Sequence, residues 1–159
     1  MNNIVYIDDQ FEKQKICNDI LRSLPDYFAI EAAIIEYVNN VASMPFWIYQ
    51  DENKNPLAFI AIKKHNQYTA EIYVMAVVSS RHRQGIGKQL IDVVASYCSN
   101  NNIEFLTVRT LDESNSDPSY NKTRQFYFSV GFKPLEVFPL LWDKNNPCLF
   151  MVKALSKEK

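Results

Sequence analysis

A strand-like run that leads through a glycine-punctuated loop into a helix constrains this chain most. The apolar run covers residues 72–78, the loop reads Arg-His-Arg-Gln-Gly-Ile-Gly-Lys over residues 81–88, and the helical pattern begins at Gly87. Glycines let the backbone approach a phosphate closely, and a helix N-terminus adds about half a positive charge. Arg81, Arg83 and Lys88 bring full charges to the same place. The sequence therefore predicts a site for a ligand that carries a pyrophosphate.

Two common phosphate loops do not fit these residues. A P-loop requires glycine at the position of His82 and a serine or threonine at the position of Gln89. A dinucleotide-binding fingerprint requires a third glycine at the position of Leu90. Both readings are excluded by residue identity.

The loop instead resembles the acyl-CoA loop of the GNAT superfamily of N-acetyltransferases, Arg/Gln-x-x-Gly-x-Gly/Ala after a strand, with His82 at the Arg/Gln position. Residues 123–132 resemble the superfamily's second signature, in which a short helix carries Tyr127 and ends in Gly-Phe. The glycine is a natural helix C-cap. Tyr120 replaces the family's frequent asparagine, although Asn121 follows it. The two motifs stand in the family's order and cover about the middle half of the chain.

The resemblance implies an α/β fold, with a mixed, mostly antiparallel central sheet and helices on both faces. It implies one N-acetyltransferase (GNAT) domain over residues 1–159. Hydrophobic periodicity and turn signals predict the same class. The expected strands are 4–7, 46–49, 57–63, 69–78, 103–110, 135–138 and 149–152. The expected helices are 10–24, 29–41, 87–98 and 119–130.

Composition limits the partners. The formal net charge of −1 gives no general attraction to nucleic acid or to an anionic membrane, and no apolar run is long enough to span a bilayer. The N-terminal residues lack the pattern of a secretion signal. Three separate cysteines and two histidines form no metal-binding pattern. We expect a cytoplasmic protein that uses no metal.

The resemblance implies acetyl-CoA as the cosubstrate. Its pyrophosphate is expected on the backbone amides of Arg83, Gln84, Gly85, Ile86, Gly87 and Lys88. The family's donor to the thioester carbonyl is a backbone amide of the central strand, which corresponds here to Val77 or Val78. Asn121 is the remaining candidate for a hydrogen bond to the pantetheine arm.

Two side chains are predicted to move protons. Tyr127 holds the position of the superfamily's usual proton donor to the leaving thiolate. Glu71 lies fourteen residues before Gly85, the spacing of the catalytic glutamate in the histone acetyltransferases of this superfamily. The alternatives for the base are Glu31, Glu36, Asp112 and Glu113.

The predicted reaction is acetyl transfer to a primary amine by direct attack in a ternary complex. A covalent acyl-cysteine route is disfavoured, since no cysteine has an evident basic partner. A non-catalytic acyl-CoA sensor with the same fold is the alternative. The acceptor is a small-molecule or peptide amine, with a protein lysine also open, and a homodimer is left open. Aromatic residues in 26–47 and 134–147 are predicted either to line the acceptor site or to pack a core.

Overall fold

The computed structural model describes residues 3–115 and 117–156, which fold as two compact units. The first unit comprises the chain up to Lys63 together with Tyr73–Val94, and the second comprises Lys64–Ile72 and the chain from Ala95 onward. Strand β4 (Thr69–Val77) and helix α3 (Ile86–Asn100) each run from one unit into the other. The other elements of the first unit are β1 (Ile4–Tyr6), α1 (Gln10–Arg22), α2 (Glu31–Val41), β2 (Phe46–Gln50), β3 (Pro56–Lys64, all but its last residue) and the 3₁₀ turn η1 (Ser79–Arg81). Those of the second unit are β5 (Phe105–Leu111), α4 (Pro118–Ser129), β6 (Lys133–Asp143) and β7 (Asn146–Ala154).

The strands form one mixed seven-stranded sheet in the order β1-β2-β3-β4-β5-β7-β6. The ladders β1–β2, β2–β3, β5–β7 and β6–β7 are antiparallel, whereas β4 and β5 are parallel. The parallel ladder is short: it runs from Thr69 opposite Phe105 to Ile72 opposite Val108. The predicted mixed, mostly antiparallel sheet is confirmed.

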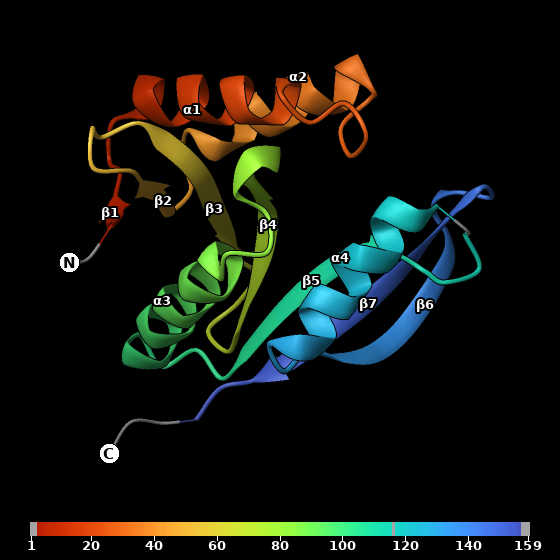
Figure 1. Cartoon of the computed structure of the whole chain (residues 1–159). Coiled ribbons are helices and arrows are strands. Elements are labelled where there is room, and N and C mark those ends of the chain that lie inside the picture. Colours follow the sequence, from red (N-terminus) through yellow and green to blue (C-terminus); the bar gives the residue numbers. More distant parts are fainter. Residues whose placement is uncertain (1–2, 116, 157–159) are drawn as a thin grey trace. The chain divides into compact units, whose positions relative to one another are not determined.

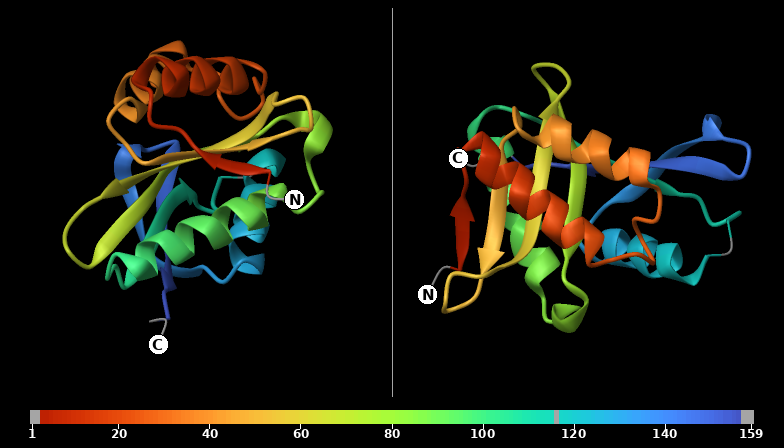
Figure 2. Two further views of the ribbon diagram at one scale, coloured as in Figure 1. Left: turned by 90° about the vertical axis from the view of Figure 1, so that its left-hand side faces the viewer. Right: turned by 90° about the horizontal axis from the view of Figure 1, so that it is seen from above.

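The core of the first unit lies under two helices. Helices α1 and α2 cover one face of its strands, and the beginning of α3 lies against the other face (Figure 2). The periodic apolar side chains of α1 and α2, such as Ile16, Leu21 and Ile34, are buried against Phe46 and Phe59. Alternating side chains of a strand point to opposite faces, so both layers of helices find apolar partners.

The second unit is built around the β6–β7 hairpin and β5, with α4 alongside β5 (Figure 1). Arg124 of α4 is buried, and its Nη1 donates to the carbonyl of Leu111 at the end of β5 (2.6 Å). Helix α4 ends at Ser129 and is followed by Gly131, whose φ of +99° is the left-handed conformation that favours glycine. The Phe132 amide donates to the Tyr127 carbonyl. The Gly-Phe pair of the second motif therefore closes this helix.

Every expected helix and strand is present, but the boundaries and some details differ. Helix α3 begins at Ile86 rather than Gly87, and the two last strands are longer than expected because they form one continuous hairpin. Phe11, which fits the helical pattern of α1, is 81% exposed.

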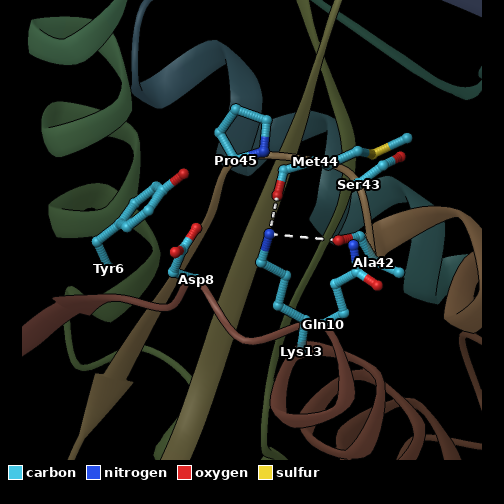
Figure 3. A pocket seen from close by; sticks show the side chains of 8 residues that line it. All are labelled: Tyr6, Asp8, Gln10, Lys13, Ala42, Ser43, Met44 and Pro45. Atoms are coloured by element: carbon cyan, nitrogen blue, oxygen red, sulfur yellow. Dashed lines mark hydrogen bonds between the residues drawn. The ribbon is translucent and has the colours of Figure 1, made fainter.

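A buried lysine joins α1 to the end of α2 in the first unit. Lys13 is 5% exposed, and its Nζ donates to the carbonyls of Met44 (2.8 Å) and Ala42 (3.5 Å), as Figure 3 shows. Helix α2 has no basic residue in its own last turn, so Lys13 places a positive charge where the helix dipole is negative. The hollow around this contact has a volume of about 370 Å³ and is lined by none of the residues predicted for acetyl transfer.

Replacing Lys13 with alanine should lower the free energy of unfolding by about 1.5–3 kcal/mol, because two carbonyls at the end of α2 lose a charged donor. Urea unfolding followed by circular dichroism measures the change. Lys15→Ala is the matched control on α1: its partner is Asp19, both side chains are more than half exposed, and the expected change is below about 1 kcal/mol. Equal effects of the two substitutions would contradict a role of Lys13 at α2.

Candidate functional site

The loop before α3 leaves backbone donors without a side-chain cap. Arg83 and Gly85 both have positive φ (64° and 78°), which turns the chain sharply before the helix. The carbonyl of Gly85 accepts from the amide of Gln89, so Gly85 is the N-cap of α3. Helices α1 and α4 are capped by the carboxylates of Asp9 and Asp117, whereas glycine has no side chain to do this. The first amides of α3 are therefore available to an anionic ligand.

The cations around this loop differ in how far they are already paired. Lys88 Nζ lies 2.9 Å from a carboxylate oxygen of Asp92, one turn along α3. The pKa of Asp51 is lowered mainly by hydrogen bonds from Asn55, with a smaller contribution from the charge of Arg81. Arg83 is exposed and forms no ion pair within the described residues. Of these cations, Arg83 is the most available to a ligand.

The two candidate amides at the end of β4, those of Val77 and Val78, point in different directions. The Val78 amide donates to the Leu57 carbonyl of β3 (2.9 Å). Because successive amides of an extended strand point to opposite edges, the Val77 amide points away from β3. The carbonyl of Val77 accepts from His82 Nε2 (2.7 Å), and the His82 ring meets Tyr27 edge-on at 6.2 Å. The geometry therefore favours Val77 over Val78 as the donor to a ligand.

Glu71 lies in a buried polar cluster of the second unit and not at a solvated strand end. It is 6% exposed, and its Oε1 is 2.6 Å from His65 Nε2. Its Oε2 is 3.6 Å from Arg109 Nε. The carbon of the Arg109 guanidinium lies 4.7 Å from the centre of the Phe150 ring. Glu71 is opposite Thr107 in the parallel ladder, and Arg109 is two residues further along β5, so all three side chains share one face.

His65 and Arg109 are the members of this cluster that the sequence reasoning missed. A signal for Arg109 was present: Thr107 and Arg109 are polar residues at alternate positions of a strand whose other residues are apolar except for Thr110. His65 lies in the β3–β4 hairpin, and only the fold of that turn brings it to Glu71.

Tyr127 lies on the buried side of α4. It is 7% exposed and packs edge-on against Phe126 and Phe132, with ring centres 5.3 and 5.4 Å away. The next residue along the helix, Phe128, is 45% exposed. Asn121 is exposed in the first turn of α4.

Comparison with known proteins assigns the family. Residues 42–134, more than half of the chain, match the model of the acetyltransferase (GNAT) domain. The chain belongs to the GNAT family. It is accordingly an acyltransferase of the N-acetyltransferase type. None of the curated proteins matches this GNAT protein in sequence.

Solved structures agree with this GNAT fold. An aminoglycoside 6′-acetyltransferase type Ii superposes with a TM-score of 0.77 at 18% identity, covering 98% of this chain and 99% of its own. An aminoglycoside 6′-N-acetyltransferase complexed with coenzyme A gives 0.72 at 17% identity, with 92% of each chain covered. A GNAT acetyltransferase from Staphylococcus aureus Mu50 gives 0.76 at 18% identity, with 96% and 99% covered. At identities of 17–18%, the similarity to these three structures establishes the fold alone.

Within residues 3–115 and 117–156, no group of three or more histidine, cysteine or acidic side chains is placed to hold a metal ion. Among the helices of the same residues, none is both long and apolar enough to cross a bilayer.

The three cysteines are buried as free thiols. Burial raises the pKa of Cys17 to about 12 and those of Cys98 and Cys148 to about 11. A thiol is a nucleophile only as the thiolate, so none of the three is suited to carry an acyl group at neutral pH.

In the native protein at pH 8, all three thiols should react with Ellman's reagent far more slowly than free cysteine. A thiol of pKa 11 is ionised to only about 0.1% at that pH. Absorbance at 412 nm with and without guanidinium chloride measures this, and three equivalents should appear on unfolding. One rapidly reacting thiol in the folded protein would reopen the acyl-cysteine route.

Proposed function

We propose that this GNAT protein transfers the acetyl group of acetyl-CoA to a primary amine by direct attack in a ternary complex. When bound, acetyl-CoA supplies an activated acetyl group as a thioester. The observation that carries the proposal is the glycine-capped N-terminus of α3, which follows β4 directly and leaves its first amides to a ligand. The solved structures described as aminoglycoside acetyltransferases support a small-molecule amine as the acceptor.

The pyrophosphate is proposed to bind the amides of Ile86, Gly87 and Lys88. A Cβ placed on Gly85 meets no atom within 4 Å, so the space that a phosphate requires is open. Gln84 lies between the two left-handed residues of the turn and contributes its backbone, while Arg83 contributes charge. Phosphates bind well at such helix N-termini because donors and dipole act together.

The Val77 amide is proposed to donate to the thioester carbonyl. A donor fixed in a strand loses no freedom when negative charge develops on the oxygen, and this favours the transition state over the ground state. Asn121 remains the candidate for the pantetheine arm, since its exposed side chain has no hydrogen-bond partner among the described residues.

Glu71 is proposed as the general base. An alkylammonium of pKa about 10.4 must lose a proton before it can attack, which costs about 4–5 kcal/mol at pH 7. His65 Nε2 is 2.6 Å from Oε1 of Glu71, whereas the Nε of Arg109 is 3.6 Å from Oε2, which is too far for a short hydrogen bond. Oε2 therefore keeps a lone pair for the proton of the amine. The ammonium first passes one proton to Oε2, and the neutral amine then attacks the thioester carbon. The second proton of the nitrogen leaves as the carbon–sulfur bond breaks, and it balances the proton that the sulfur receives.

Tyr127 is proposed as the general acid. Its hydroxyl gives a proton to the leaving sulfur, and its ring is fixed by Phe126 and Phe132. General acid catalysis of this kind contributes about 10²–10⁴-fold.

A non-catalytic acyl-CoA sensor is the alternative function. It uses the same loop and the same helix, so binding of acetyl-CoA does not separate the two. Release of free thiol in the presence of an amine does, because a sensor binds without turnover.

Gly85→Glu should abolish binding of acetyl-CoA, because a carboxylate then occupies the place proposed for the pyrophosphate. Gly85→Ala should weaken binding less, since it adds strain of about 1–2 kcal/mol at a positive φ but no charge. Isothermal titration calorimetry measures both. Asn39→Glu, which adds the same charge on an exposed position of α2, is the control and should bind like wild type. Normal binding by Gly85→Glu would refute the proposed pyrophosphate site.

Glu71→Gln and Tyr127→Phe should each lower kcat by about 10²–10⁴-fold at pH 7 while acetyl-CoA still binds. The defect of Glu71→Gln should shrink between pH 7 and pH 10, because the acceptor then loses its proton to solvent. Thiol release against pH measures this.

Two exposed residues of the second unit give matched controls, Glu136→Gln on β6 and Tyr68→Phe in the β3–β4 hairpin. Both should keep wild-type rates. A pH-independent defect in Glu71→Gln would assign Glu71 a structural role and send the search for the base to Glu31, Glu36, Asp112 and Glu113.

A further inference from the structure

Arg109 lies beside the proposed base, at the first position of β5 beyond the parallel ladder. The last pair of that ladder is Ile72 with Val108. Arg109 and Glu71 share one face, and Arg109 Nε is 3.6 Å from Glu71 Oε2. The Arg109 side chain is 37% exposed, whereas that of Glu71 is 8% exposed. The cation is therefore open to solvent next to a carboxylate that is nearly covered.

The guanidinium of Arg109 is fixed, yet most of its donors are unused. Its contact with the Phe150 ring is a cation–π interaction, which holds the plane without using an N–H group. The 3.6 Å separation from Glu71 exceeds the 2.7–2.9 Å of a charge-assisted hydrogen bond. Within the described residues, neither Nη nitrogen of Arg109 forms a hydrogen bond. Arginine presents five donors in a planar fork that matches a carboxylate.

We infer that Arg109 binds a carboxylate of the acceptor, so that the acceptor is an amino acid and not a polyamine or an aminoglycoside. This inference rests on the proposed function of Glu71. An ammonium group that approaches Oε2 of Glu71 brings its neighbouring substituent within reach of Arg109. A carboxylate at that position pairs with the free donors of Arg109, whereas a second ammonium meets a like charge.

The binding of such a zwitterion exchanges one weak contact for two strong ones. The Glu71–Arg109 contact is replaced by an ammonium on Glu71 and a carboxylate on Arg109. His65 stays on the opposite oxygen of Glu71 and keeps that carboxylate in place. Arg109 is thus a specificity-determining residue, and it takes no part in proton transfer.

The test compares free amino acids with their matching amides at one pH, with rates expressed per neutral amine, because amidation removes the carboxylate and also lowers the pKa of the amino group. In wild type, kcat/KM for the amino acid should exceed that for its amide by about 10- to 150-fold, the usual effect of one hydrogen-bonded charge. In Arg109→Gln the ratio should approach one, with the loss confined to the amino acid. Arg109→Lys, which keeps the charge but not the fork, should give an intermediate ratio. Arg22→Gln, an exposed arginine on α1, is the control and should keep the wild-type ratio.

Several outcomes would overturn the inference. One is a wild-type enzyme that acetylates the amide as fast as the acid. Another is an Arg109→Gln variant that urea unfolding shows to be folded and whose kcat/KM falls equally for the amino acid and for its amide. A third is turnover of an aminoglycoside or a polyamine with none for any amino acid. If wild type binds acetyl-CoA but acetylates no amine of any class, the proposed function itself fails. If Arg109→Gln does not fold, Arg109→Lys decides through its ratio of kcat/KM for the amino acid to kcat/KM for the amide. This ratio should fall below that of wild type if the guanidinium fork binds the carboxylate. An unchanged ratio refutes the inference.

Discussion

The shortness of the parallel ladder between β4 and β5 is the constraint on which the site depends. The ladder ends at Ile72 and Val108, yet β4 continues to Val77. The Val78 amide donates to the Leu57 carbonyl of β3. The polar groups on the edge of β4 that faces away from β3 therefore need other partners beyond Ile72. The His82 imidazole supplies one by donating to the Val77 carbonyl. An edge of this kind is where a ligand with amide groups of its own can bind by continuing the hydrogen-bond pattern of a strand.

A second constraint is the charge buried on Glu71. A carboxylate removed from water is destabilising unless cations or donors surround it, and His65 and Arg109 meet this need. The same partners limit the use of Glu71 as a base, because an oxygen whose lone pair accepts a short hydrogen bond is less able to accept a proton from a substrate. The two oxygens resolve this conflict by having different neighbours: one is 2.6 Å from His65, the other 3.6 Å from Arg109. In the proposed mechanism, Oε1 of Glu71 thus serves stability and Oε2 serves as the base.

The sequence predicted the fold class and every helix and strand, because local periodicity and turn residues act over a few neighbours. It predicted the glycine loop for the same reason, since Gly85 and Gly131 adopt positive φ as a turn and a helix end require. It could not predict the partners of Glu71. Arg109 meets Glu71 through strand register, and His65 through the shape of a hairpin, neither of which has a periodic signal. It also could not tell that Phe11 is exposed, since a helical pattern does not fix where the buried face ends.

The aromatic residues of 26–47 had two open interpretations, a lining for the acceptor site or a packed core. Tyr27, Phe28 and Tyr37 pack against the core of the first unit, and the Tyr37 ring meets that of Tyr73 edge-on at 5.3 Å. Phe46 is fully buried and stacks on Phe59. Aromatic rings engaged in this way contribute to stability, Phe46 through full burial and the three partly buried rings through their contacts with the core. If Arg109 binds the carboxylate of the acceptor as inferred, selection of the acceptor falls to a guanidinium that is held on the Phe150 ring beside the proposed base.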